Sequence, residues 1–255
     1  MSSSKFISKD YQSLCKIYDE LMLGVEYDLW FDLIVRLCEE NFDNPKVKIL
    51  EIGGGTGVLG RKLADFGFVY LGSDISFDMA KTAIKKNLNF VCADCRNLPF
   101  SNNFDLAIFL FDGINYLFDI KQFTQTFKQI HSILKNGGLF LFDITTEVNS
   151  MNNFFNYKES HAGTDYAYIR ESYYDVKNRE QHNDFEIFVK EKGDNHQCNT
   201  YHRFSEQHCQ KVHPVKSVID SIPLDLFEIA GTWGDFERKK WNSKSERVHF
   251  LLRKK

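Results

Sequence analysis

The sequence predicts an α/β protein whose core is a seven-stranded, mostly parallel β-sheet with helices on both faces, joined by an inserted antiparallel β meander. Three observations support this prediction. Apolar strand-like runs alternate with helical patterns as far as Asp143, helical periodicity is missing from about residue 166 to 209, and two further apolar runs follow near the C-terminus. Strands that alternate with helices favour parallel pairing through right-handed crossovers.

Two leading helices and five strands are expected in the first part of the chain. Apolar residues at helical spacing indicate helices at residues 14–21 and, after a break near Gly24, at 30–37. Strands are expected at residues 47–52, 68–74, 89–93, 104–111 and 138–143, with helices between them at 61–66, 77–86 and 120–134. Gly67 ends the first of these helices, because glycine readily adopts the left-handed conformation found after helix C-termini.

The second part departs from this alternation. From about residue 166 to 209, aromatic and β-branched residues alternate with polar ones, which predicts the antiparallel meander. A helix is expected at 215–221, then strands at 226–230 and 248–252 that form an antiparallel pair at the sheet edge, separated by a solvated charged loop at 235–247. The predicted divisions are residues 1–149 for the leading helices and core, 150–212 for the inserted meander, and 213–255 for the end of the core sheet.

Composition argues against several classes of protein. The 32 Lys and Arg against 35 Asp and Glu give a net charge of −3, so general binding to nucleic acid is not expected. The sequence has no apolar run of signal-peptide or membrane-spanning length. We therefore expect a cytoplasmic protein without a membrane partner, either a monomer or a homodimer.

The six cysteines have no dense pattern of spacings, which indicates reduced thiols rather than disulfide bonds. Cys92 and Cys95 have CxxC spacing, and a second group of metal-ligand types is spread over Cys198, Cys209, His196, His202, His208 and His213. A structural zinc site normally has two close ligand pairs, whereas this second group is scattered along strand-like sequence. We therefore predict no metal site.

A glycine-rich loop follows the first strand, in Leu50-Glu51-Ile52-Gly53-Gly54-Gly55-Thr56-Gly57-Val58-Leu59-Gly60. Side chains are missing there because a ligand lies against the backbone, where amide groups at a helix start point toward it. The spacing Gly55-x-Gly57-x-x-Gly60 also fits the dinucleotide fingerprint, with Asp74 at the position of a ribose-binding acid. The loop alone therefore leaves a nicotinamide cofactor open.

Further motifs resemble those of the class I methyltransferases that use S-adenosylmethionine (SAM), which have a Rossmann-like sheet. Glu51 lies just before the glycines, where the family has an acid that suits the ammonium and sulfonium of SAM. The family's third-strand acid matches Asp94 in Cys92-Ala93-Asp94-Cys95, and Asn97-Leu98-Pro99-Phe100 follows it. The runs at residues 104–107 and 134–140 are similar to the family's later motifs. NAD enzymes have no reason to share this combination.

The resemblance implies a set of cofactor-binding residues. In the family's pattern, Gly53 and Gly55 make room for the cofactor, Asp74 accepts hydrogen bonds from the ribose hydroxyls, and Asp94 accepts the adenine amino group. The full set is Tyr18, Glu51, Gly53, Gly55, Asp74, Ile75, Met79, Asp94, Cys95 and Phe111. Asp74 and Asp94 could instead be helix caps, and Gly60 is expected to serve helix packing only.

The expected reaction is methyl transfer, with the cofactor supplying an activated methyl group and the protein positioning the nucleophile. The acceptor should lie beyond the carboxyl ends of the strands. Candidates there are Asp112, Asn115, Tyr116, Asp143, Thr145 and Thr146. No catalytic base is assigned, although Tyr116 and Asp112 are the candidates. The leading helices and the meander are expected to cover the acceptor pocket. His202 and His208 could act as bases at neutral pH, but each is expected to be a surface or strand-packing residue.

The layout outside the core is similar to the branch of small-molecule N-methyltransferases that act on amino sugars. In that branch a tyrosine of the leading helix lies near SAM, which points to Tyr18 or Tyr11. A small-molecule acceptor with an N or O nucleophile is favoured because the Asn-Pro-Pro-Tyr-like motif of base-flipping enzymes is replaced by Phe111-Asp112-Gly113-Ile114. The alternatives are an NAD-dependent oxidoreductase and a SAM-binding module without turnover.

Overall fold

The computed structural model describes residues 11–101, 103–191 and 200–255. Its core is a seven-stranded sheet in the order β10-β11-β5-β4-β1-β2-β3. The strands are β1 (Lys48–Ile52), β2 (Val69–Asp74), β3 (Phe90–Cys92), β4 (Phe104–Phe109), β5 (Leu134–Thr145), β10 (Phe227–Trp233) and β11 (Arg247–Lys254). The first five pair in parallel, and β11 pairs antiparallel with both β5 and β10. The predicted fold class is therefore confirmed.

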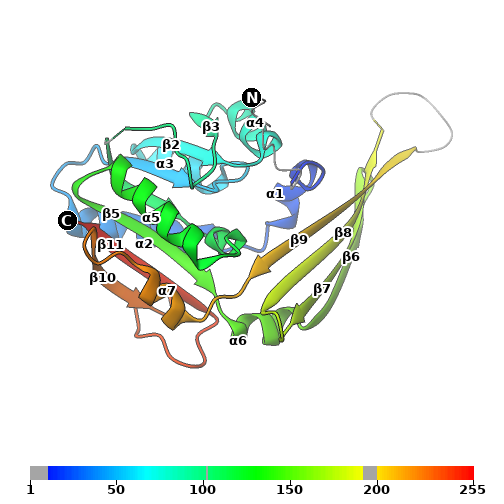
Figure 1. The fold of residues 1–255 in the computed structure, drawn as a ribbon. Coiled ribbons are helices and arrows are strands. Elements are labelled where there is room, and N and C mark those ends of the chain that lie inside the picture. The colour runs from blue at the N-terminus through cyan, green and yellow to red at the C-terminus, as the bar shows by residue number, and fades with distance from the viewer. Residues whose placement is uncertain (1–10, 102, 192–199) are drawn as a thin grey trace, which may run out of the picture.

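Helices cover both faces of this sheet (Figure 1). The helices α2 (Tyr27–Asn41), α3 (Val58–Phe66) and α4 (Phe77–Lys85) bury their apolar sides in one hydrophobic cluster, and α5 (Ile120–Ile133) and α7 (Val215–Ser221) bury theirs in another. Strand residues alternate between the two clusters, because successive side chains of a strand point to opposite faces. Both faces of the sheet are thus buried, as expected for a parallel α/β core.

A second, four-stranded antiparallel sheet projects from the core (Figure 1). It consists of β6 (Asn156–Ala162), β7 (Tyr166–Asp175), β8 (Glu180–Lys190) and β9 (Tyr201–Lys211), paired in chain order. The short helices α6 (Glu147–Asn149) and η3 (Ser150–Phe154) lead into it from β5, and α7 follows it. This is the predicted meander, inserted between two parts of the core.

The N-terminal segment lies between the core and the inserted sheet (Figure 1). The prediction of one helix at residues 14–21 is wrong in detail, because the chain forms the 3₁₀ turn η1 (Leu14–Lys16) and then the single turn α1 (Tyr18–Leu21). Leu14 and Ile17 are buried against Phe185 and Ile187 of β8. Packing against the inserted sheet, rather than helical periodicity, therefore determines where these side chains point.

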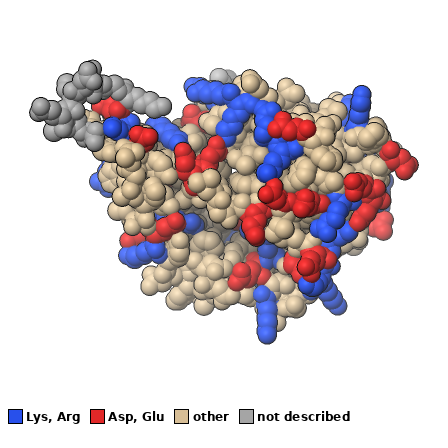
Figure 2. Space-filling view, turned by 180° about the vertical axis from the view of Figure 1, so that it is seen from behind, with Lys and Arg blue, Asp and Glu red and all other residues tan. Residues whose placement is uncertain are grey.

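The surface carries mixed charge. Figure 2 shows acidic and basic side chains close together over one face of the molecule. This mixture agrees with the small net charge of −3. Among the described residues, no helix combines the length and apolar character needed to cross a membrane.

Candidate functional site

A cavity of about 700 Å³ opens at the carboxyl ends of β1, β2 and β4. Its walls come from three parts of the chain: the core loops, the N-terminal segment and the inner face of the inserted sheet. All of the predicted cofactor and catalytic candidates line it: Tyr18, Glu51, Gly53, Gly55, Asp74, Ile75, Met79, Asp94, Cys95, Phe111, Asp112 and Tyr116. The structure therefore brings together residues spread over about a hundred positions, although their roles stay predictions.

The glycine loop between β1 and α3 requires unusual backbone angles. Gly53, Gly55 and Gly57 have φ angles of 64°, 56° and 80°, in the region that residues with a Cβ atom rarely adopt. A Cβ on Gly53 would lie 2.9 Å from the ring of Phe109, and one on Gly55 would lie 3.5 Å from the ring of Tyr18. The loop therefore approaches both cavity walls closely.

Asp74, at the end of β2, holds this loop in place. One carboxylate oxygen accepts the Gly55 amide at 2.9 Å and the other accepts the Ser76 amide at 2.8 Å. The helix-cap alternative is wrong for this residue, because Ser76 is the N-cap of α4. Burial raises the pKa of Asp74 to about 6, although the amide hydrogen bonds act in the opposite direction.

Glu51 is a second buried acid on the cavity wall, only 3% exposed. Burial raises its pKa to about 7, while a hydrogen bond donated by the Tyr70 hydroxyl opposes the rise. Gly60 makes this contact possible, since a Cβ there would lie 2.2 Å from the Tyr70 oxygen. The prediction that Gly60 serves packing is thus confirmed. Among the described residues, no cation pairs with Glu51 or Asp74.

Asp94 lies in the loop after β3, and no helix begins there, so it is not a helix cap. Its carboxylate accepts both the amide of Arg96, at 2.8 Å, and the Arg96 guanidinium, with Nε 2.9 and 3.0 Å from the two oxygens. Arg96 also lines the cavity. Arg96 was not among the predicted site residues, although it stands only two positions after the acid on which it folds back.

Arg247 corrects another prediction. It was expected in a solvated loop, but it begins β11, lines the cavity and lies between two carboxylates, with its side chain 28% exposed. It pairs with Asp112 at 2.8 Å and with Asp143. The second oxygen of Asp112 accepts the side-chain amide of Gln210 at 2.8 Å. Both oxygens of the candidate base Asp112 are therefore engaged.

Other acceptor-side candidates have structural roles. Asn115 is fully buried and bridges two elements, donating to the Lys211 carbonyl of β9 at 2.9 Å and accepting the Thr145 amide of β5 at 3.1 Å. Thr146 is the N-cap of α6. These residues and Asp143 are not part of the cavity wall, so Tyr116 and Asp112 are the candidates that line it.

His208 was expected at the surface or in strand packing, and it does pack on β9 but is not at the surface. It is 4% exposed, lines the cavity, and lies with Nδ1 3.3 Å from the Tyr116 hydroxyl and Nε2 2.9 Å from Glu206. His202, in contrast, is exposed, as expected. A sequence signal did exist, because the alternate residues Glu206, His208 and Gln210 of one strand are polar and all point to the buried face.

The tyrosines of the inserted sheet do not line the cavity. Tyr166, Tyr168, Tyr173, Tyr174 and Tyr201 are missing from the cavity wall, and two of them, Tyr168 and Tyr174, are buried. The wall on this side comes instead from Phe154 of η3 and, in the inserted sheet, from Arg170, Gln181, Asn183, Phe185 and residues 207–210 of β9.

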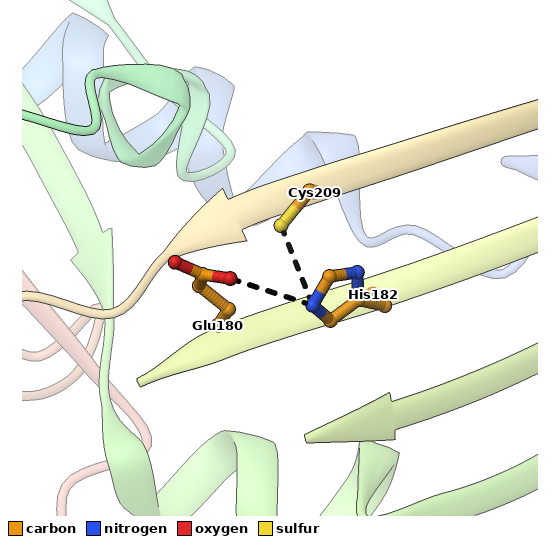
Figure 3. A group of neighbouring side chains, drawn as sticks. All are labelled: Glu180, His182 and Cys209. Atoms are coloured by element: carbon orange, nitrogen blue, oxygen red, sulfur yellow. Dashed lines mark hydrogen bonds and ion pairs between the residues drawn. The ribbon is translucent and has the colours of Figure 1, made fainter. Parts of the chain in front are cut away.

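A group of ligand-type side chains lies elsewhere on the inserted sheet (Figure 3). His182 Nε2 is 3.7 Å from both Cys209 Sγ and a Glu180 oxygen. Two of these side chains also have other partners on neighbouring strands. Tyr173 stacks on His182, and Lys211 pairs with Glu180 at 3.3 Å. Of the cysteines and histidines named from the sequence as possible metal ligands, Cys198 and His196 lie outside the described residues. His182 and Glu180 were not among the residues named there.

The fold and the cavity together define a class of protein. A parallel sheet, a glycine loop after β1, and acids at the ends of β1 and β2 and after β3 form the arrangement of the class I SAM-dependent methyltransferases. Two buried carboxylates without a cation suit a cofactor that carries an ammonium, a sulfonium and ribose hydroxyls. The residues present therefore fit SAM.

Comparisons with known proteins agree. Residues 49–138 match the methyltransferase domain family. "Putative methyltransferase YqeM" of Bacillus subtilis is 29% identical over 250 residues, covering 96% of this chain and 97% of that protein. The structure of an S-adenosylmethionine-dependent methyltransferase from Clostridium acetobutylicum matches with a TM-score of 0.79 and 25% identity over 95% of this chain and 98% of that one. Residues 49–138 thus match a methyltransferase domain, and nearly the whole chain is similar to a SAM-dependent methyltransferase, which supports S-adenosylmethionine as its cofactor.

The sugar N-methyltransferase KedS8 of Streptoalloteichus has the same fold, with a TM-score of 0.76 and coverage of 98% of both chains. Its sequence identity to this chain is 13%. The predicted similarity to the amino-sugar N-methyltransferases therefore extends from the leading helix and the inserted meander to the whole fold. The sugar acceptor is a property of that relative.

Proposed function

We propose that this protein is an enzyme that transfers the methyl group of SAM to the nitrogen or oxygen of a small-molecule acceptor (EC 2.1.1.-). The observation that carries the proposal is the pair of buried acids, Glu51 and Asp74, which line one cavity without a cation among the described residues. Buried carboxylates are costly unless they are paired or hydrogen-bonded. A cationic, hydroxyl-bearing cofactor satisfies both.

The cofactor-binding set divides by chemistry. Glu51 binds the ammonium group, and Asp74, already held by two amides, accepts the ribose hydroxyls. Asp94 and the Cys95 amide bind the adenine edge, against which Ile75 and Met79 pack. Gly53 and Gly55 keep the backbone free of side chains beside the ligand, while Tyr18 and Phe111 lie over the methionine side. All of these residues line the same cavity.

Bound SAM supplies a methyl group on a cationic sulfur, already activated for displacement. The chain's own part is to hold the acceptor in line and to exclude water. The N-terminal segment and the inserted sheet do this, because Tyr11, Leu14 and Tyr18 form one wall and Arg170, Phe185 and His208 form another. A cavity of about 700 Å³ suits a small acceptor rather than a macromolecule.

Calorimetric titration tests the proposal. The wild type, Asp74→Ala and the control Asp65→Ala, whose side chain is exposed on α3, are each titrated with S-adenosylhomocysteine (SAH) and with NADH. We expect micromolar binding of SAH by the wild type and the control, strong weakening in Asp74→Ala, and no binding of NADH. Binding of NADH alone would refute the proposed cofactor assignment. Binding of SAH without turnover of any acceptor would favour a non-catalytic SAM-binding module.

A further inference from the structure

Four side chains form a hydrogen-bonded series along the cavity wall. Glu206 Oε1 lies 2.9 Å from His208 Nε2, His208 Nδ1 lies 3.3 Å from the Tyr116 oxygen, and the Tyr116 oxygen lies 2.6 Å from the Tyr11 oxygen. Glu206 and His208 belong to β9, Tyr116 to η2 (Gly113–Tyr116), and Tyr11 to the N-terminal segment. Tyr11, Tyr116 and His208 all line the cavity. The proposed function uses none of these contacts.

The partners determine which way the hydrogen bonds run. The Glu206 carboxylate also accepts the backbone amides of Ser13 and Leu14, at 2.9 and 3.0 Å, so it is an ionised acceptor and His208 Nε2 must carry the proton. With the proton on Nε2, Nδ1 is the ring nitrogen that can accept, and the Tyr116 hydroxyl lies where it can donate to it. Tyr11 in turn donates to Tyr116. The series is therefore aligned to carry a proton from Tyr11 to the imidazole.

Burial keeps the Tyr11 phenol protonated between proton transfers. The pKa of Tyr11 is raised well above its ordinary value, first by burial and then by the neighbouring Tyr116, so a lasting phenolate is disfavoured. The ionisable groups that face the series from the surrounding elements are Tyr18, Asp74, Asp112 and Arg170. Asp112 is already engaged by Arg247 and Gln210. His208 is thus the imidazole that hydrogen bonds connect to this wall.

Resting on the proposed function, we propose that Tyr11, Tyr116 and His208 form a proton relay that deprotonates the acceptor, whose nucleophile is therefore an ammonium or a hydroxyl group. As the nucleophile's N–H or O–H bond breaks, its electron pair forms the bond to the methyl carbon and the carbon–sulfur bond breaks. The released proton passes to the Tyr11 oxygen, the Tyr11 proton to Tyr116, and the Tyr116 proton to His208 Nδ1. The imidazolium that results is paired with Glu206. Tyr11 is the catalytic residue that contacts the acceptor, and Glu206 is a positioning residue.

The first test measures the His208 tautomer and needs no acceptor. Nitrogen-15 NMR of histidine-labelled full-length protein with SAH bound should show His208 held as the Nε2–H tautomer, beside His213, whose Nε2 donates to the Leu117 carbonyl. His208→Gln should remove this signal, Glu206→Gln should abolish the tautomer preference, and the exposed control His202→Gln should leave the signal in place. A His208 found as the Nδ1–H tautomer, or doubly protonated throughout the neutral range, would overturn the proposal.

The second test measures SAH release from SAM with benzylamine, catechol and dimethyl sulfide as probe acceptors. The relay predicts turnover with the amine or the phenol, lowered about 10²-fold or more in kcat by Tyr11→Phe and by His208→Gln with little change in KM. This loss should shrink as rising pH deprotonates the acceptor in solution, and the exposed control Tyr173→Phe should match the wild type. Turnover with the thioether alone, or variants that keep wild-type kcat, would contradict the relay. SAH binding without any turnover would count against the proposed function. The His208 tautomer measured in the first test would then show whether the hydrogen-bonded series is aligned as proposed.

Discussion

The raised pKa of Glu51 makes cofactor affinity depend on pH near neutrality. Burial holds the pKa of this carboxyl at about 7, well above its ordinary value of 4.5. Binding of an ammonium group requires the carboxylate, so affinity should be lost as pH falls through 7. This affinity can be changed in two ways: by the pH, and by the substitution Glu51→Gln, which replaces the carboxyl with a side chain that cannot ionise.

The magnitude follows from the fraction ionised. A carboxyl with this pKa is about nine-tenths ionised at pH 8 and about one-tenth at pH 6, so the Kd for SAH should be about tenfold weaker at the lower pH. Asp74, whose pKa is raised to about 6, adds roughly a further factor of two because it is about half protonated at pH 6. Glu51→Gln should keep only this smaller dependence. Tyr70→Phe removes a hydrogen bond that lowers the pKa of Glu51 and should move the midpoint to higher pH.

The assay is calorimetric titration with SAH at pH 6, 7 and 8, in pairs of buffers that differ in ionisation enthalpy. Because binding converts neutral Glu51 and Asp74 to their carboxylates, about 1.4 protons should be released at pH 6, about 0.9 from Glu51 and about 0.5 from Asp74, and only about 0.1 at pH 8. A Kd that does not change across this range, or an equal pH dependence in Glu51→Gln, would refute the reasoning.

Two further substitutions test the packing around the cavity by urea unfolding. Gly60→Ala places a Cβ 2.2 Å from the Tyr70 oxygen, so we expect a loss of about 1–3 kcal/mol in the free energy of unfolding, together with weaker SAH binding as Tyr70 leaves Glu51. Arg247→Met leaves buried carboxylates without their cation and should cost about 3–5 kcal/mol at pH 7.5. This cost should shrink toward pH 5, because the pKa of Asp143 is already raised to about 6 and its neutral form needs no cation.

Matched controls accompany both substitutions. Gly24→Ala adds its Cβ in open space and should change the free energy of unfolding by less than about 0.5 kcal/mol. Arg203→Met removes an exposed guanidinium on the outer face of β9 and should be similarly mild. If Gly60→Ala were as mild as its control, Tyr70 would not be fixed by close packing. An Arg247→Met cost that stayed constant with pH would contradict the account of the paired carboxylates.

Local patterns in the sequence were enough to predict the core and one side of the site. The helix expected at residues 215–221 coincides with α7, and the strands flanking the glycine loop lie within a residue or two of their expected positions. In the core, the spacing of apolar residues indicates which side chains are buried, and glycines mark the turns between elements. The same patterns brought Glu51, Asp74 and Asp94 to one edge of the sheet, because parallel strands end together there.

The errors come from contacts between distant parts of the chain. Arg247 meets Asp143 only because β11 pairs antiparallel with β5, which places Arg247 opposite Thr145, and the charged residues before it concealed the start of the strand. His208 meets Tyr116 across 92 positions, which no local pattern reports. The helix expected at 14–21 is broken because its apolar residues pack against β8.

Glu206 ties the beginning of the described chain to the far end of the inserted sheet. Its carboxylate accepts the amides of Tyr11, Ser13 and Leu14 from positions more than 190 residues earlier. During synthesis the core strands β1 to β5 precede β9, so residues 11–14 lack this carboxylate acceptor until most of the chain exists, whereas Asp19 can already meet Thr56 and Lys86 of the core. The cavity wall that β9 and residues 11–14 build together can therefore close only after β9 has been made. A chain that ends before β9 would contain the cofactor loop yet leave it open to water.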